Sequence, residues 1–288
     1  MFQAPPPLRS RPGPPRGRFT VNWDSPQAEG LKHWWPLHGD TFLKNLVTPT
    51  YNLGVHNTPT LVTGGAANSP SLSIWRFDGT NDGLDVADAP SVDIPVSQPF
   101  LITFWGRTSA ASGTFFVCKR TSSTAAGYDL GVNLGAANRF SMRLREGATT
   151  RQVNYSNAVT VNGLWHLYGG IVDFVGDTGY VLFDGTRQGT PVSLAGDTNY
   201  GSSAKLAIGY RPAGTPDGYI AADIRDVRIY HRPPNISFER SLFDPGTRWE
   251  LYYELHRRIY SFPPVAAVGG EAAQRSPYLM TLGVGAGG

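Results

Sequence analysis

The segment Ile74–Asp93 reads IWRFDGTNDGLDVADAPSVD, and its pattern decides the fold class. Its first four residues alternate across a strand, so every second side chain points to the same face. Asp78-Gly79 then breaks the strand, because glycine accepts the positive φ angle that a tight turn needs. A second turn-rich stretch leads into Leu84–Val86, another short alternating run. The segment therefore predicts two β-strands joined by an acidic glycine turn.

The composition of the chain suits a β-rich protein with many turns. Of its 288 residues, 34 are glycine, 23 are proline, 12% are aromatic and only 16% are charged. This length is enough for one large sandwich with appendages. The single cysteine, Cys118, excludes an intramolecular disulfide framework and is expected to be a plain buried residue. The net charge of +3 is too small to indicate a specific nucleic-acid partner for the whole chain.

Hydrophobic alternation predicts further strands. Phe100–Trp105 is apolar on both faces, which indicates a strand in the middle of a sandwich or one whose outer face is also covered. In Tyr219–Tyr230 the apolar side switches between Ile224 and Val227, which predicts a β-bulge or twist near Arg225-Asp226. Residues 39–73 read as loop. Other strands are expected at 128–132, 140–145, 165–172, 178–183 and 205–209.

The segment after the last strand predicts one short helix near residues 235–243. Asn235 or Ser237 can cap its first turn, and Glu239 suits the positive end of the helix dipole. Asp244-Pro245-Gly246 then ends it. Near the other end of the chain, Asp24 or Ser25 can cap a short turn that starts at Pro26.

Four segments resemble, in order, the motifs of the laminin G-like, concanavalin A-like jelly-roll domain of lectins and glucanases. These are the FDG turn at Phe77–Gly79, WHLYGGIVD at Trp165–Asp173, YVLFDG at Tyr180–Gly185 and DVRIYHR at Asp226–Arg232. The resemblance covers about residues 70–245. It implies an all-β fold, an antiparallel two-sheet jelly-roll sandwich. The flanks of the domain resemble those found in tailed-phage and prophage proteins. These flanks are a leader that combines Asn22–Pro26 with Leu31–Leu37, and an exit segment at Thr247–Pro264.

We expect three parts: an extended Pro/Arg-rich arm at 1–20, the sandwich at 21–245, and a strap and Gly/Ala-rich tail at 246–288. Proline fixes φ and removes amide donors, so the first arm is neither helix nor central strand. It carries Arg9, Arg11, Arg16 and Arg18 and no acidic residue. Two interpretations stay open: a disordered basic tail, or an arm that orders on a neighbouring subunit.

The strap after residue 246 is aromatic and basic together. One interpretation is that it packs Trp249, Tyr252 and Tyr253 onto the sandwich. The other is a subunit contact that also uses Arg257 and Arg258, because Trp, Tyr and Arg are enriched at the centres of protein interfaces.

Three kinds of site bear on function: catalytic, metal-binding and glycan-binding. Glycosidases need two carboxyls at a set separation, and none of the six glutamates pairs with another acid at strand spacing within the sandwich, so we expect no catalytic residue. The family resemblance implies a structural calcium ion near Asp78 and Asp82. Arg225 stands where the family has a second aspartate, and we expect it to pair with one of these carboxylates instead of a metal. No other cofactor is expected.

A glycan site would need exposed aromatic side chains beside polar groups, for which the candidates are Trp105, Trp165, Tyr200 and Tyr210, with the two tryptophans preferred. Most tryptophans on strands with two apolar faces are core residues, so carbohydrate binding rests here on fold-level likeness alone.

Because the arms flank a sandwich with no visible active site, the sequence favours a non-enzymatic virion structural protein. It would be a capsid decoration or fibre-like subunit that contacts its own copies and other virion proteins. We expect synthesis in the host cytoplasm, since Met1–Ser10 lacks the apolar core of a signal peptide. No run approaches the ~20 apolar residues of a membrane span. Two alternatives stay open: a carbohydrate-binding adhesin or lectin module for host-surface glycans, and a glycoside-acting enzyme.

Overall fold

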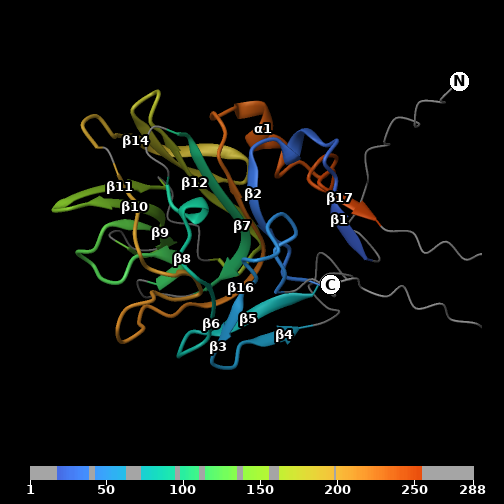
Figure 1. Cartoon of the computed structure of the whole chain (residues 1–288), viewed down its shortest axis with the longest axis horizontal. Coiled ribbons are helices and arrows are strands. Elements are labelled where there is room, and N and C mark those ends of the chain that lie inside the picture. The colour runs from blue at the N-terminus through green and yellow to red at the C-terminus, as the bar shows by residue number, and fades with distance from the viewer. Residues whose placement is uncertain are drawn as a thin grey trace, which may run out of the picture. The chain divides into compact units, whose positions relative to one another are not determined.

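Two antiparallel β-sheets face each other across one hydrophobic core (Figure 1). The structure is a computed structural model. It describes residues 18–38, 43–62, 73–94, 98–109, 114–134, 139–155, 162–197 and 199–254, and every structural statement below concerns these residues. The two-sheet jelly-roll fold class expected from the sequence is confirmed.

The first sheet has seven strands in the order β11-β10-β9-β8-β15-β6-β3. Their bounds in chain order are β3 (Gly54–His56), β6 (Gly83–Val86), β8 (Thr114–Lys119), β9 (Gly127–Val132), β10 (Phe140–Glu146), β11 (Thr149–Asn154) and β15 (Leu206–Ile208). A tight turn at Gly147 joins β10 and β11 into an antiparallel hairpin at one edge of this sheet.

The second sheet follows the order β14-β13-β12-β7-β16-β5-β4, and β2 also pairs with β16. The bounds are β2 (Leu31–Trp35), β4 (Thr60–Val62), β5 (Ile74–Asp78), β7 (Phe100–Thr108), β12 (His166–Asp173), β13 (Thr178–Phe183), β14 (Thr186–Ser193) and β16 (Ala221–Tyr230). The N-terminal half of β16 pairs with β5 and its C-terminal half pairs with β2. The central strand β16 therefore holds both of these early strands in the sheet.

β7 shows why this sheet is covered on both faces. Phe100, Ile102 and Phe104 point into the core between the sheets. Leu101 and Trp105 point the other way, into a second apolar cluster. The expectation that the outer face of this strand is also covered is therefore confirmed, because alternate side chains of a strand lie on opposite faces.

The second cluster is an outer layer built from the two ends of the described chain. It contains the strands β1 (Phe19–Val21) and β17 (Tyr252–Glu254), which pair antiparallel (Figure 1). The 3₁₀ helix η1 (Pro26–Ala28) and the α-helix α1 (Ile236–Ser241) also contribute side chains to it. A second 3₁₀ turn, η3 (Pro90–Val92), lies between β6 and β7 in the chain.

Side-chain caps fix both helices of the outer layer. Ser25 accepts from the amide of Gln27 at η1, and Asn235 accepts from the amide of Phe238 at α1. The short helix expected near 235–243 is therefore confirmed. Arg187 of β14 donates to both carboxylate oxygens of Glu239, at 2.8 and 2.7 Å, which ties α1 to the sheet.

Gln27 joins the layer together. Its buried side chain donates to the carbonyls of Ser241 and Thr247 and accepts from Arg228. These bonds satisfy a buried amide that would otherwise cost free energy.

The predicted bulge in the last long strand is present. The pairing of β16 with β7 shifts register between Arg225 and Arg228, and Asp226 between them has a φ of 57°. The extra residue returns the apolar side chains to one face, so Ile224 and Val227 both lie in the core between the sheets.

The loop expected at residues 39–73 is only partly a loop. β3 and β4 lie within it and extend the edges of the two sheets by pairing with β6 and β5. Both strands are three residues long and largely exposed, so their hydrophobic pattern is too short to stand out from a turn-rich background. Within the described ranges, no helix is long and apolar enough to cross a membrane.

Candidate ligand-binding site

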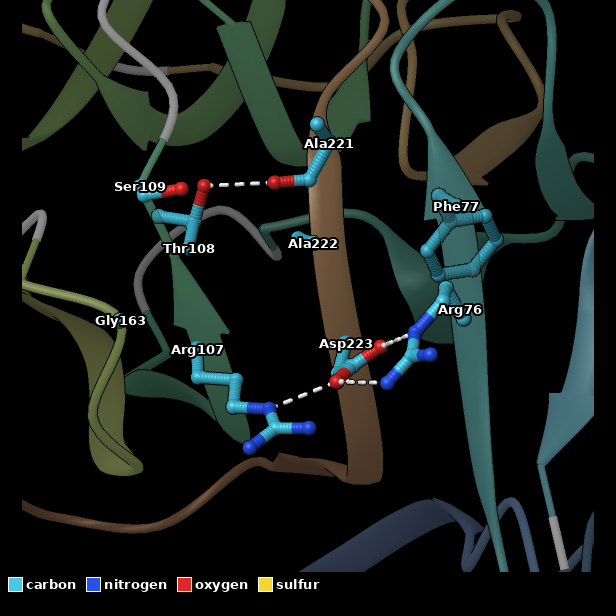
Figure 2. Close-up of a pocket in the computed structure, with 9 residues that line it drawn as sticks. All are labelled: Arg76, Phe77, Arg107, Thr108, Ser109, Gly163, Ala221, Ala222 and Asp223. Atoms are coloured by element: carbon cyan, nitrogen blue, oxygen red, sulfur yellow. Dashed lines mark hydrogen bonds and ion pairs between the residues drawn. The ribbon is translucent and has the colours of Figure 1, made fainter. Parts of the chain in front are cut away.

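A pocket of about 300 Å³ opens where β5, β16 and β7 run side by side (Figure 2). Its charged side chains are Arg76 from β5, Asp223 from β16 and Arg107 from β7. The end of β7, the residue Gly163 and the start of β16 complete the lining. The pocket therefore takes one charged residue from each of three neighbouring strands.

Strand register brings the three charges together. Asp223 is the direct pairing partner of Arg76 across β5 and of Arg107 across β7. Side chains directly opposite each other on one face of a sheet lie within contact distance. Figure 2 shows both guanidinium groups converging on the carboxylate from opposite sides.

The contacts of Asp223 use both of its oxygens. Nε and Nη2 of Arg76 donate to Oδ1 and Oδ2 at 2.8 and 3.1 Å, and Nε of Arg107 donates to Oδ2 at 2.6 Å. The bidentate fork is the geometry in which Arg recognises carboxylates best. The hydrogen bonds and charge of Asp223 raise the pKa of Arg76 above its ordinary value.

Burial differs sharply within this group. The side chain of Asp223 is 6% exposed, whereas those of Arg76 and Arg107 are 50% and 26% exposed. The carboxylate therefore forms the floor of the pocket and the two guanidinium groups form its rim. Two arginines against one aspartate leave the pocket with one net positive charge.

Tryptophan and arginine side chains alternate beside the pocket. The guanidinium carbon of Arg107 lies 5.3 Å from the ring centre of Trp165, and that of Arg225 lies 4.6 Å from the same ring. The guanidinium carbon of Arg225 also lies 5.6 Å from the ring centre of Trp105. That of Arg248 lies 5.4 Å from the same ring. These are distances at which a cation is attracted to an aromatic face.

Arg225 is an unusual member of this stack. It is 6% exposed, and its Nη1 has no hydrogen-bond partner among the described residues. Burial lowers its pKa to about 10, with the nearby charges of Arg248 and Arg107 adding to the effect. A buried guanidinium usually contacts a carboxylate, whereas that of Arg225 contacts the indole rings of Trp105 and Trp165.

The two tryptophans proposed as glycan contacts have different surroundings. Trp105 is 7% exposed and stacks on Phe243 at a centroid distance of 5.8 Å, so its ring belongs to the outer layer. Trp165 is partly exposed and borders the pocket through Arg107. Only Trp165 is placed beside an open site.

The calcium candidates are engaged within their own turn. Asp78 accepts from the amides of Thr80 and Asn81, and Asp82 accepts from the amides of Asp78 and Thr58. Across the described ranges, no group of three or more His, Cys, Asp or Glu side chains is placed to hold a metal ion. Amide hydrogen bonds are the usual role of aspartates in such turns.

Arg225 does not pair with either of these aspartates, contrary to the sequence expectation. Asp78 lies opposite Ala221 in the register of β5 and β16. Arg225 lies four positions beyond Ala221, or about 13 Å along an extended strand. Arg225 therefore stacks on Trp105 and Trp165 and lies out of reach of the turn.

The residues proposed for subunit contacts fall into three groups. Trp249 and Tyr252 are 5% and 3% exposed and are buried in the outer layer of their own chain, whereas Tyr253 is 48% exposed. Arg18 lies at the exposed start of the described chain. The others, Arg9, Arg11, Arg16, Arg257 and Arg258, lie outside the described residues.

The pocket itself was not predicted from the sequence. Arg76 and Asp223 are 147 residues apart, and Arg107 and Asp223 are 116 apart. The usable signal was a charged side chain within an otherwise apolar strand pattern, as in IWRFD and AADIRD. Such a residue on a half-buried strand needs a partner of opposite charge.

The family of the chain follows from its sequence. A family model described as the concanavalin A-like lectin/glucanases superfamily matches residues 78–235, so the chain belongs to that superfamily. No curated protein matches the sequence.

Two solved structures of binding domains have a similar fold. The binding domain of Paraclostridial Mosquitocidal Protein 1 superposes with a TM-score of 0.56 and 15% identity, over 69% of this chain and 48% of that one. The ligand-binding domain of botulinum neurotoxin serotype D, in complex with N-acetylneuraminic acid, gives 0.58 and 12% identity, over 76% and 52%. This chain thus matches about half the length of these domains.

A third similar structure is matched over almost its whole length. It is domain 4 of AbnA, a GH43 extracellular arabinanase from Geobacillus stearothermophilus, in complex with arabinotriose. The TM-score is 0.57 at 13% identity, over 74% of this chain and 98% of that one. At such identities the likeness shows the fold alone. Neither the family match nor these similar structures are specific to a phage form of the domain, so the virion role stays a prediction.

Proposed function

We propose that the chain is a non-catalytic carbohydrate-binding module whose ligand enters the Arg76–Asp223–Arg107 pocket. The observation that carries the proposal is the meeting of three charged side chains from neighbouring strands in an open pocket beside an indole. Membership of a lectin and glucanase superfamily supports it. So do similar folds solved with N-acetylneuraminic acid and with arabinotriose.

The pocket has the chemistry of a small-ligand site. Its volume lies at the lower end of the roughly 300–1,000 Å³ typical of such sites. The guanidinium groups are held in place by Asp223, so they lose little conformational freedom when a ligand binds. The partly exposed indole of Trp165, whose ring is stacked with Arg107 and Arg225, adds apolar surface beside these polar groups.

The same geometry argues for binding without hydrolysis. A glycosidase needs two carboxyl groups, one to protonate the leaving oxygen and one to act as nucleophile or base. Among the residues that line the pocket, Asp223 is the one carboxylate, and both of its oxygens are engaged by arginines. The polar side chains that remain for a ligand are mainly the N–H donors of the two arginines, with the hydroxyls of Thr108 and Ser109 beside them, and such groups suit recognition.

A glycan array followed by isothermal titration tests the proposal. We expect the full chain to bind a subset of oligosaccharides and to leave them uncleaved. Arg107→Ala should weaken binding at least tenfold with little change in melting temperature, because the Arg107 side chain lies on the rim of the pocket. The matched control is Arg145→Ala, which removes a partly exposed arginine from β10.

Binding to no glycan would overturn the proposal, as would hydrolysis of a bound glycan. Full binding by Arg107→Ala would place any sugar site elsewhere. The predicted virion location is a separate question about where such a module acts. Mass spectrometry of purified particles tests it.

A further inference from the structure

The pocket offers a ligand mainly hydrogen-bond donors. The Oδ atoms of Asp223 already accept from Nε and Nη2 of Arg76 and from Nε of Arg107. Within the described part of the chain, neither Nη atom of Arg107 has a hydrogen-bond partner, and neither has Nη1 of Arg76. A guanidinium donates through its N–H groups and cannot accept. The ligand atoms that fit these groups are therefore acceptors.

Two hydroxyl side chains, Thr108 and Ser109, also line the pocket. They are fewer than the free N–H groups of the two arginines, so donors remain in excess. Oγ1 of Thr108 donates to the carbonyl of Ala221 at 2.7 Å, which uses the proton of the hydroxyl within the sheet (Figure 2). Neutral sugars present hydroxyls, each of which seeks an acceptor as well as a donor. Carboxylate and sulfate groups present acceptor oxygens only.

The local charge also favours an anion. Two cations, Arg76 and Arg107, face one carboxylate, Asp223, within the pocket. Arg225 adds a third cation nearby, because it and Arg107 both contact the ring of Trp165. In the described chain no carboxylate forms an ion pair with Arg225. A partly desolvated site with excess positive charge attracts an anionic group more strongly than the open surface does.

Taken together, the donor set and the charge define the ligand more closely than the fold does. We infer that the pocket selects an acidic saccharide, whose carboxylate or sulfate group is held by the Nη atoms of Arg107 and Arg76. This inference rests on the proposed carbohydrate-binding function of the pocket. Trp165 is the neighbouring apolar surface for the ring that carries the anionic group.

Charge-matched sugar pairs test the inference. The titrations would compare trigalacturonic acid with its methyl ester, sialyllactose with lactose, and a 6-sulfated galactose trimer with the unsulfated trimer. We expect the acidic member of at least one pair to bind ten or more times tighter than its neutral partner, and this preference to shrink as salt rises. The first two pairs report on a carboxylate and the third on a sulfate.

Two pocket variants and a charge-matched control connect the preference to the pocket. Arg107→Gln and Arg76→Gln each remove one cation and should reduce the acidic-to-neutral ratio about tenfold or more. Lys205→Gln makes the same change in net charge at a side chain 59% exposed, which pairs with Asp85, and should leave the ratio unchanged. Melting temperatures of all three variants identify any loss of folding.

The outcomes separate this inference from the proposed function. If neutral and acidic partners bind equally well in every pair, and Arg107→Gln weakens both alike, the selectivity is wrong and the carbohydrate-binding function stands. If no member of any pair binds, the inference fails, and the glycan array decides whether the carbohydrate-binding function stands. A ratio that falls equally in Lys205→Gln would mean that the net charge of the whole chain, not the pocket, draws the acidic sugar.

Discussion

The indole nitrogen of Trp34 donates to Oδ1 of Asp226 across 2.6 Å, which joins β2 to a bulge in β16 that lies 192 residues further along the chain. The same carboxylate accepts from Nε and Nη2 of Arg228, at 2.9 and 2.7 Å. All three residues are buried. Asp226 holds a positive φ, so the bulge aims its side chain at two partners that a regular strand residue would not reach together.

Asp226→Asn isolates the charge of this residue, because asparagine also tolerates the left-handed backbone region. The substitution leaves Arg228 as a buried cation without its carboxylate. We expect the free energy of unfolding to fall by about 3–5 kcal/mol, measured by urea denaturation. Asp217→Asn is the control. It removes a carboxylate that pairs with Arg211 and whose side chain is 46% exposed, so it should cost at most about 1 kcal/mol. Equal losses in the two variants would mean that the buried pair adds no more than a surface one.

Two adjacent tyrosines separate internal packing from contact with other molecules. Tyr252 meets the ring of Trp34 edge-on at 4.7 Å and that of Phe19 at 4.9 Å, whereas the neighbouring Tyr253 is 48% exposed. Tyr252→Ala should lower the free energy of unfolding by about 3–5 kcal/mol, and Tyr253→Ala by about 0.5 kcal/mol or less.

Light scattering on the same two variants addresses self-association. If Tyr253 lies in a subunit contact, Tyr253→Ala should lower the oligomeric state and leave the unfolding curve of the monomer in place. An unchanged particle mass would remove Tyr253 from the set of contact residues.

Two buried histidines, His33 and His38, and the half-buried His231 make the fold sensitive to acid. Burial lowers the pKa values of His33, His38 and His231 to about 4 each. For His33 there is a structural reason: its Nδ1 accepts from the amide of Asn45, and its Nε2 donates to Ser91. A second ring proton would point at the amide hydrogens of Asn45, so the folded state keeps the ring neutral.

The unfolded chain protonates His33 below its ordinary pKa of 6.5, while the folded chain does not until about 4. The unfolded state therefore binds more protons in this window, and stability falls as the pH drops through it. We expect His33 to account for about 2 kcal/mol of stability lost between pH 7.5 and pH 5. In His33→Gln the difference between urea unfolding free energies at these two pH values should be smaller by that amount. An identical pH dependence in both proteins would show that His33 titrates normally.

Local patterns were enough to predict much of the fold. The strands at 100–108 and 140–146 and the capped helix at 236–241 follow from alternation and from Asn235, signals that lie within a few residues of one another. The bulge was also readable, since the apolar face of β16 shifts by one residue at Asp226. The three-residue strands β1, β3, β4 and β17 were not predicted, because each is set by the edge that it pairs with and not by its own sequence.

The pocket lay beyond such reasoning for a similar cause. The contact between Arg76 and Asp223 depends on the register of β16 against β5, and one residue of slip would put the two side chains on opposite faces. Trp105 and Trp165 look alike in the sequence as candidates for a surface. Their different exposure depends on Phe243, which arrives from the segment after α1 to cover one and not the other.

The pairing of β1 with β17 also has a consequence for the time course of folding. Phe19 pairs with Glu254 in the register of β1 and β17. After Phe19 has been synthesised, the ribosome must therefore add more than 200 residues before this pairing can form. At synthesis rates of about 5–20 residues per second, the interval is on the order of ten seconds or more. During this interval the aromatic side chains of Phe19 and Trp34 lack Tyr252, against which they pack in the folded protein. The nascent chain is therefore most prone to aggregate late in its synthesis, when the sheets can form but the outer layer cannot close.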